Sequence, residues 1–324
     1  MNQRVRINTT GGPEVMQLIQ DEPQRPGPDQ VLLRQYAVGL NYIDVYFRTG
    51  LYPQALPGGL GLEGAGIVEA VGDNVREFQA GDRVAYAGGP TGAYATYRLI
   101  PASVLVRLPD AIDFETAAAV MLKGLTVAYL FHRTYALKPG QTMVFHAAAG
   151  GVGLIACQWA RALGVKMIGT AGSEKKVAMA REHGCWEVIN YNAQNFVSRV
   201  RELTDGQGVP VVYDSVGKAT FTGSLDCLAP LGLMVSFGNA SGAVEDFSLL
   251  DLSKRGSLFV TRPRLFDYVA SREALNALSG LLFEQLLSGG LEAQVGRRYA
   301  LSDIQQAHRD LEGRELTGSA ILLP

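Results

Sequence analysis

The stretch MVFHAAAGGVGLIACQWARALG, residues 143–164, decides the fold of this chain. It begins with a short apolar run of the kind that forms a buried parallel strand, and small residues follow at once. Read against the pattern G-x-G-x-x-G, the turn places Ala148, Gly150 and Gly153 at the three glycine positions. The helix that follows is apolar nearly all round. Strand, glycine turn and buried helix together predict the start of a dinucleotide-binding unit.

The residues of this turn have separate tasks in the predicted unit. Because Gly150 has no Cβ, the backbone there can approach a pyrophosphate, and Gly153 lets the helix pack closely on the strand. The free N–H groups at the start of the helix favour an anion. Ala148 is compatible with the turn if its φ stays negative. The alternative interpretation is that the small residues serve close packing alone, with no ligand.

Strands and helices alternate regularly after the turn, which predicts a doubly wound parallel sheet of six strands. The predicted strands span residues 143–147, 165–171, 186–191, 209–214, 232–238 and 257–261, and the predicted helices span 151–163, 174–183, 194–204 and 219–229.

The first third of the chain has a different texture, with short strands punctuated by turns, and we expect no helix in it. Asp113 is placed to cap a helix over 114–122, and a second helix over 125–137 is expected after Lys123 and Gly124, where the domain boundary should lie. Near the end we expect helices over 272–287 and 302–312 and a last strand, SAILL. The last sixty or so residues are expected to return to the first domain.

Composition excludes several classes of protein. The 29 basic and 31 acidic residues of this 324-residue chain are interspersed and give a net charge of −2, so nothing favours nucleic acid or an anionic membrane. The three cysteines are far apart, and no signal segment or apolar run of about 18 residues stands out. None of the four histidines has the spacing of a zinc site, and His146 is expected to be a core residue. We expect a cytoplasmic protein.

The end of the second predicted strand indicates which nucleotide binds. An NAD site would place an acidic residue there, but the chain has Ala171, Gly172 and Ser173, followed by Lys175 and Lys176. A hydroxyl and a lysine suit the 2′-phosphate of NADPH. The alternatives are that the lysines are ordinary surface residues and that Glu174 opposes the phosphate. Tyr191, at the end of the third strand, is either a neighbour of the same phosphate or a plain strand-end residue.

Eight blocks of sequence resemble the medium-chain dehydrogenase/reductase superfamily and, within it, the zinc-independent quinone oxidoreductases similar to ζ-crystallin. They are GLNYIDVYFRTGLYP (39–53), GLEGAGIVEAVG (61–72), GDRVAY (81–86), AAAGGVG (147–153), VINY (188–191), YDSVG (213–217), SFGNASG (236–242) and VTRP (260–263). Zinc-dependent relatives carry a cysteine ligand and a histidine ligand where this chain has Asn41 and Leu62, which cannot replace them. We therefore expect no metal.

The resemblance implies a GroES-like, β-rich substrate domain over 1–123 and 264–324, a Rossmann domain over 124–263, NADPH as cofactor, and a homodimer joined through the nucleotide domains. It places the nicotinamide at Asn41 and Thr126, and the 2′-phosphate at Gly172, Ser173, Lys176 and Tyr191. The pyrophosphate would lie on Gly150, Gly151 and Val152, and the remaining cofactor contacts would be Ser215, Phe237, Gly238, Asn239, Arg262 and Arg314.

Without a metal, hydrogen-bond donors must polarise the carbonyl of the hydride acceptor. Asn41, Tyr46 and Tyr52 are the candidate catalytic residues, although Asn41 could only orient the nicotinamide and either tyrosine could be a core residue. Asp44 is expected to be structural, in an ion pair or a turn. The first hypothesis is an NADPH-dependent quinone reductase. Alternatives are a reductase of enones or enoyl groups and a cofactor-binding structural or RNA-binding protein, although the charge argues against RNA.

Overall fold

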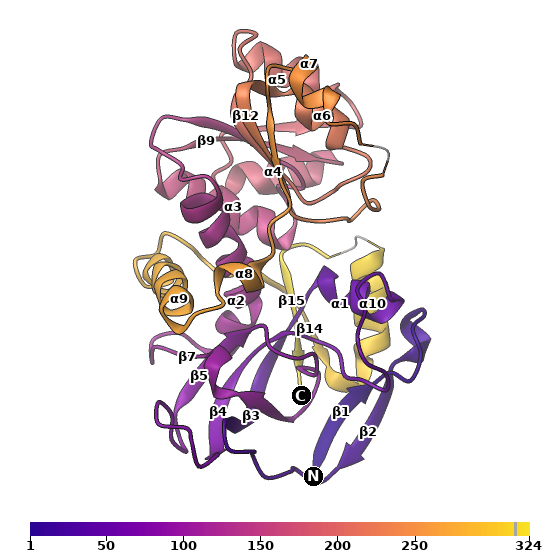
Figure 1. Ribbon diagram of the computed structural model, residues 1–324, viewed down its shortest axis with the longest axis vertical. Helices are drawn as coiled ribbons and strands as arrows, with labels where there is room; N and C mark the ends of the chain where they lie inside the picture. The colour runs from indigo at the N-terminus through magenta and orange to yellow at the C-terminus, as the bar shows by residue number, and fades with distance from the viewer. Residues whose placement is uncertain (246, 314–315) are drawn as a thin grey trace. The chain divides into compact units, whose positions relative to one another are not determined.

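The computed structural model describes residues 1–245, 247–313 and 316–324. Residue contacts divide the chain into two units. The first comprises Met1–Leu125, Val269–Ser288 and Ala293–Pro324, and the second comprises Thr126–Tyr268 and Gly289–Glu292. We refer to them as the β-rich unit and the nucleotide unit. The α/β fold, with a β-rich part and a doubly wound parallel sheet, is confirmed (Figure 1).

The nucleotide unit is built on a six-stranded parallel sheet in the order β10-β9-β8-β11-β12-β13. Counted from β8, this is the Rossmann order 3-2-1-4-5-6. The helices pack in two groups, α3 against α4 and α5 against α6. The elements are β8 (Thr142–Phe145), α3 (Gly151–Ala162), β9 (Lys166–Ala171), α4 (Glu174–Glu182), β10 (Glu187–Asn190), α5 (Phe196–Leu203), β11 (Val209–Asp214), α6 (Phe221–Asp226), β12 (Leu228–Ser236), α7 (Leu250–Lys254), β13 (Phe259–Thr261) and α8 (Leu265–Tyr268).

The β-rich unit contains a seven-stranded sheet in which β14-β15-β3-β4-β5-β7 are neighbours and β6 pairs with β3, and a separate pair, β1 with β2. The C-terminal strand β15 lies antiparallel to β3, so the end of the chain closes the sheet begun near its start. The elements are β1 (Asn2–Arg6), β2 (Gln17–Asp21), β3 (Gln30–Leu40), α1 (Tyr42–Thr49), β4 (Glu63–Val71), β5 (Arg83–Ala87), β6 (Tyr97–Pro101), β7 (Leu105–Arg107), α9 (Arg272–Leu287), β14 (Val295–Ala300), α10 (Ile304–Glu312) and β15 (Ser319–Leu323).

The prediction that no helix interrupts the first third was wrong, because α1 spans Tyr42–Thr49. Asn41 is its N-cap, and the carboxylate of Asp44, in the first turn, accepts the Asn41 N–H at 2.9 Å. This is the carboxylate half of a capping box, which starts a helix by satisfying a donor that the helix leaves open. Gly50 ends the helix in the left-handed conformation, with φ of 84°.

The two helices expected over 114–122 and 125–137 are one, α2 (Phe114–Tyr129), continued by a π-helical turn at Leu130–Thr134. The helix continues through Gly124. A Cβ at this position would overlap Leu282 of α9, so the glycine makes room for that side chain. Residues Phe114–Thr134 are also long and apolar enough to cross a membrane, although 78% of the apolar 18-residue window within them is buried. Such burial is typical of a core helix.

Candidate functional site

The glycine turn joins β8 to α3, so the predicted order of strand, turn and helix is confirmed. Ala147, after β8, takes the left-handed conformation with φ of 56°, and Gly150 is the N-cap of α3. A Cβ at Gly153 would overlap the carbonyl oxygens of Ala147 and Ala148, so glycine is required for the helix to start this close to the turn. Gly150, the N-cap of α3, has no side chain with which to cap the helix. Its first N–H groups, on Gly151 and Val152, therefore suit an anion.

The four residues predicted for the 2′-phosphate come together at the end of β9. Ser173 caps α4 by accepting the Lys176 N–H at 3.4 Å, and the Tyr191 N–H donates to Ala171 at 3.1 Å. A Cβ at Gly172 would overlap the Tyr191 hydroxyl, so that hydroxyl lies directly against the strand end. Gly172, Ser173, Lys176 and Tyr191 thus form one cluster.

Glu174, the residue that argued against a phosphate here, has another partner. Its carboxylate accepts a hydrogen bond from the Asn190 amide at 2.6 Å. The Asn192 side chain donates to the Gly172 carbonyl at 2.8 Å, which ties the loop after β10 to the loop after β9. The Glu174 carboxylate, beside the cluster of Gly172, Ser173, Lys176 and Tyr191, is therefore already hydrogen-bonded to Asn190.

A second cluster lies at the ends of β11, β12 and β13. A Cβ at Gly238 would overlap Ser215, so the two loops touch through their backbones. Arg262 donates to the Ser236 carbonyl at 2.8 Å and, when the Asn239 amide oxygen faces it, to Asn239 at 3.1 Å. Phe237, the remaining predicted contact, donates its N–H to the carbonyl of Asp214 at 2.8 Å. Ligands of open α/β sheets bind at such strand ends.

A series of buried hydrogen bonds runs from Thr170 through His146 and Ser224 to Asp214, at the end of β11. His146 is 1% exposed and hydrogen-bonds to the hydroxyls of Thr170 and Ser224, each at 2.9 Å, and Ser224 donates to Asp214 at 2.9 Å. Burial lowers the pKa of His146, although Asp214 opposes that shift. The expectation that His146 is a satisfied core residue is confirmed. Asp214 was not among the predicted site residues, although it holds the loop that contains Ser215.

In the β-rich unit, the candidate catalytic residues lie on α1 and just after it. The rings of Tyr46 and Tyr52 meet edge to face with centroids 5.2 Å apart, and the Tyr52 N–H donates to the Tyr46 carbonyl at 3.0 Å. Both tyrosines are half-buried, whereas Asn41, at the start of the helix, is 4% exposed. The two tyrosines are therefore neighbours, and Asn41 is held by a different set of contacts.

Two charged residues that the sequence analysis missed hold Asn41. The Asn41 amide donates to the Glu63 carboxylate at 2.6 Å, and the Lys123 ammonium lies 3.5 Å from the same oxygen. Glu63 is fully buried and Lys123 is 6% exposed. The available signal was an acidic residue, Glu63, flanked on both sides by small and apolar residues, because a buried charge needs a partner.

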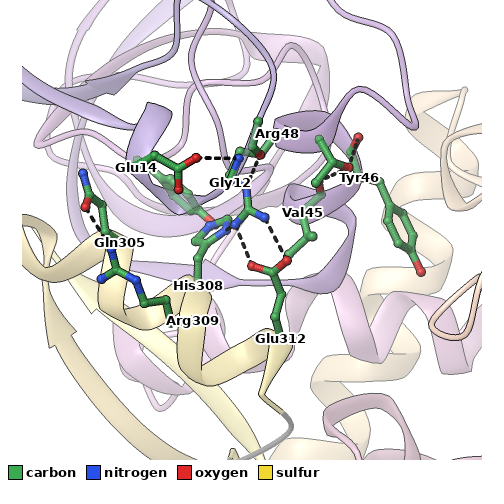
Figure 2. Close-up of polar contacts among 12 residues, drawn as sticks. Gly12, Glu14, Val45, Tyr46, Arg48, Gln305, His308, Arg309 and Glu312 are labelled. Atoms are coloured by element: carbon green, nitrogen blue, oxygen red, sulfur yellow. Dashed lines mark hydrogen bonds and ion pairs between the residues drawn. The ribbon is translucent and has the colours of Figure 1, made fainter.

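The end of α1 is fixed by Arg48, as Figure 2 shows. Its guanidinium, 1% exposed, pairs with both carboxylate oxygens of Glu312 at 2.8 Å and donates to the Gly11 carbonyl at 3.1 Å. It also contacts Nδ1 of His308 at 2.9 Å. Such a bidentate pair fixes orientation as well as distance. α1 is therefore anchored to α10 by one buried side chain.

Asp44 and His308 are linked through the Tyr94 hydroxyl, which hydrogen-bonds to both side chains. Burial disfavours the charged form of each. Burial raises the pKa of Asp44 from 3.8 to about 7, with Glu63 adding to the rise and hydrogen bonds from Tyr94 and Asn41 opposing it. Burial and the neighbouring Arg48 lower the pKa of His308 to about 3. The ion pair or turn expected for Asp44 is replaced by helix capping. Neutral His308 can donate through Nε2 to Tyr94 while Nδ1 accepts from Arg48.

The remaining predicted residues are placed as follows. Thr126 lies on α2 and is 8% exposed, and Leu62, which stands where zinc-dependent relatives have a histidine, is 1% exposed. Arg314 lies outside the described residues. Within residues 1–245, 247–313 and 316–324, no group of three or more His, Cys, Asp and Glu side chains could hold a metal ion.

Comparison with known proteins places both units in one superfamily. Residues 27–110 match the alcohol dehydrogenase GroES-like domain, and residues 151–275 match the zinc-binding dehydrogenase domain. The chain is 54% identical to a quinone oxidoreductase of Pseudomonas aeruginosa, with 100% of both chains covered.

Solved structures agree with this assignment. The structure of Escherichia coli quinone oxidoreductase complexed with NADPH matches with a TM-score of 0.98 and 50% identity, over 99% of this chain and 100% of that one. A 2-haloacrylate reductase of a Burkholderia species is 43% identical over 98% of both chains.

Proposed function

The chain belongs to the quinone oxidoreductase family of the medium-chain dehydrogenases and reductases, and from that premise we propose that it transfers a hydride from NADPH to a quinone. The observation that carries the choice of cofactor is the cluster at the end of β9. The strand ends in Ala171, Gly172 and Ser173 where an NAD site would have an acidic residue, and Ser173, Lys176 and Tyr191 lie together beside it, which supports a 2′-phosphate there. The NADPH bound to the Escherichia coli relative supports this choice.

The bound nicotinamide supplies the hydride, and the protein holds it against an electron-poor acceptor. In this proposal Asn41 and Thr126 meet the nicotinamide, and Tyr46 and Tyr52 line the place of the acceptor. Gly150, Gly151 and Val152 hold the pyrophosphate. The cluster of Ser215, Phe237, Gly238, Asn239 and Arg262, together with Arg314, completes the cofactor contacts.

One experiment separates this function from the alternatives. NADPH oxidation by the purified protein should be measured with a benzoquinone, with an α,β-unsaturated ketone or acid, and without an acceptor. Turnover with the quinone supports the proposal. The relationship to 2-haloacrylate reductase favours reduction of an activated carbon–carbon double bond as the second candidate. Tight NADPH binding without turnover of any acceptor would favour a structural role.

The choice of NADPH is tested at Lys176. If its ammonium pairs with the 2′-phosphate, Lys176→Ala should lose about 1.5 to 3 kcal/mol of NADPH binding, roughly 10- to 150-fold in Kd, and leave NADH binding nearly unchanged. Titration of cofactor fluorescence measures both. Lys175→Ala is the matched control, because Lys175 is an exposed neighbour on the same helix. An equal loss for NADPH and NADH would contradict the assignment.

We also propose a homodimer joined through the nucleotide units and a cytoplasmic location. The dimer is supported by large apolar side chains near β13, which ends the parallel sheet: Phe259 is 60% exposed, and Leu249 and Leu250 are 76% and 65% exposed. The three free, buried cysteines suit a reducing compartment. Sedimentation at micromolar concentration would measure the oligomeric state.

A further inference from the structure

Glu63 is a buried carboxylate whose recorded partners are all hydrogen-bond donors. Its Oε1 accepts the Leu122 N–H of α2 at 2.7 Å, and its Oε2 accepts the Asn41 amide at 2.6 Å. The Lys123 ammonium lies 3.5 Å from Oε2 and supplies a compensating charge. The carboxylate is therefore fixed from three directions, and the Asn41 amide is one of them.

The fold also reserves the space that this carboxylate fills. A Cβ at Gly39, on the neighbouring strand β3, would overlap Oε2 of Glu63 and the carbonyl oxygen of Ala118. Glycine at position 39 is thus a condition for the carboxylate to reach Asn41. Because the site is close-packed, Glu63 has little freedom to turn away.

This arrangement decides which way the Asn41 amide faces. The Glu63 carboxylate accepts the hydrogen bond that joins it to Asn41, so the NH₂ group of Asn41 points toward Glu63. The main chain of Asn41 is fixed as well, through its N–H bond to Asp44. The Asn41 side chain also faces the Asp44 N–H within the capping box, so what it can offer a ligand is the remaining lone pair of Oδ1 and the second amide hydrogen. That pair complements a primary carboxamide, whereas a quinone carries acceptors only.

We propose, on the basis of the function proposed above, that Glu63 is a positioning residue which sets Asn41 to accept the N–H of the nicotinamide carboxamide. Asn41 then recognises the cofactor and does not polarise the quinone. The protein should consequently discriminate against a cofactor whose carboxamide lacks its N–H, and this discrimination should depend on Glu63.

The test compares NADPH with its reduced 3-acetylpyridine analogue, in which a methyl group replaces the carboxamide NH₂. The ratio of kcat/KM for the two cofactors is measured with one benzoquinone. Glu63→Gln keeps the shape of the side chain but can donate or accept, so the Asn41 amide is free to reverse. The preference for NADPH should fall about tenfold, as for the loss of one hydrogen bond. Glu69→Gln makes the same change at an exposed position of β4 and should leave the preference as it is in the original protein.

Binding of 2′-phospho-ADP-ribose, which lacks the nicotinamide, reports whether the rest of the cofactor site is intact. The proposal is overturned if Glu63→Gln binds this fragment normally and lowers kcat/KM equally for both cofactors. If that variant does not fold, Asn41→Ala is used, and an unchanged preference there also overturns the proposal. If the folded protein reduces no quinone, the function proposed above is wrong. The preference for NADPH over the 3-acetylpyridine analogue is then measured from the Kd values of the two cofactors.

Discussion

Asp44 and Asp214 are both fully buried, yet they accept different numbers of hydrogen bonds. Asp214 accepts four hydrogen bonds, two on each oxygen: from the N–H groups of Val216 and Gly217, and from the hydroxyls of Thr220 and Ser224. Asp44 accepts two, both on Oδ2, from the Asn41 N–H and the Tyr94 hydroxyl. Its Oδ1 is buried without a partner in the part of the chain that the structure describes.

The two sites differ in how many donors the fold supplies to a buried carboxylate. At Asp44 the loss of hydration outweighs two hydrogen bonds, and the pKa rises to about 7. Asp214, which holds the loop that contains Ser215, has two donors on each carboxylate oxygen. Asp44, which caps α1, has donors on one oxygen only and titrates near neutrality.

The largest expected effect concerns the pH dependence of stability. Between about pH 4 and pH 7, folded Asp44 keeps a proton that the unfolded chain has released, so its contribution to the free energy of unfolding falls as pH rises. Asp44→Asn removes this dependence and keeps an oxygen for the two donors. The free energy of unfolding of the variant minus that of the original protein should rise by about 4 kcal/mol across that window.

Urea unfolding of both proteins at a series of pH values measures this difference. His308 contributes in the opposite direction, because its lowered pKa makes stability rise between about pH 3 and pH 6.5, but it is present in both proteins and cancels. A difference that stays constant with pH would contradict the raised pKa of Asp44.

The next effect is expected at Asp214, where the same substitution should be severe. Asp214→Asn replaces an acceptor of two hydrogen bonds with an NH₂ group that faces donors, which should cost about 3 kcal/mol at pH 7. Asp44→Asn at pH 5 is the matched control and should cost less than about 1 kcal/mol, because Oδ1 has no hydrogen-bond partner to lose among the described residues. Equal losses in urea unfolding would mean that donor number does not distinguish the sites.

The nucleotide unit was readily predictable because each parallel strand is an apolar run that ends at a turn. α1 was not, because YIDVYFRT is rich in β-branched and aromatic residues typical of strands. What makes it a helix is the contact between Asn41 and Asp44, and the structure shows that Asp44 is further supported by Tyr94, fifty positions away. Local propensity is a weak guide where such tertiary contacts decide.

The candidate site divides in the same way. Residues at strand ends, such as Gly172 and Ser215, could be named because topology gathers the carboxyl ends of parallel strands at one edge. Glu63 and Lys123 could not, because their role depends on partners in distant segments and on the space left by Gly39. A pattern of residue types does not reveal which buried charges will be paired.

The smallest expected effect comes from removing one of the two donors to Asp44. Tyr94→Phe deletes the hydroxyl that donates to Oδ2 at 2.7 Å and leaves Nε2 of His308 without that contact, which should cost about 1 to 2 kcal/mol at pH 5. Because the Tyr94 hydrogen bond holds the pKa of Asp44 down, its loss should raise that pKa further. The free energy of unfolding of the double variant Tyr94→Phe, Asp44→Asn minus that of Tyr94→Phe is measured against pH. This difference should level off at a higher pH than the difference between Asp44→Asn and the original protein. A curve that levels off at the same pH would show that burial alone sets the titration of Asp44 and that the Tyr94 hydrogen bond does not lower its pKa.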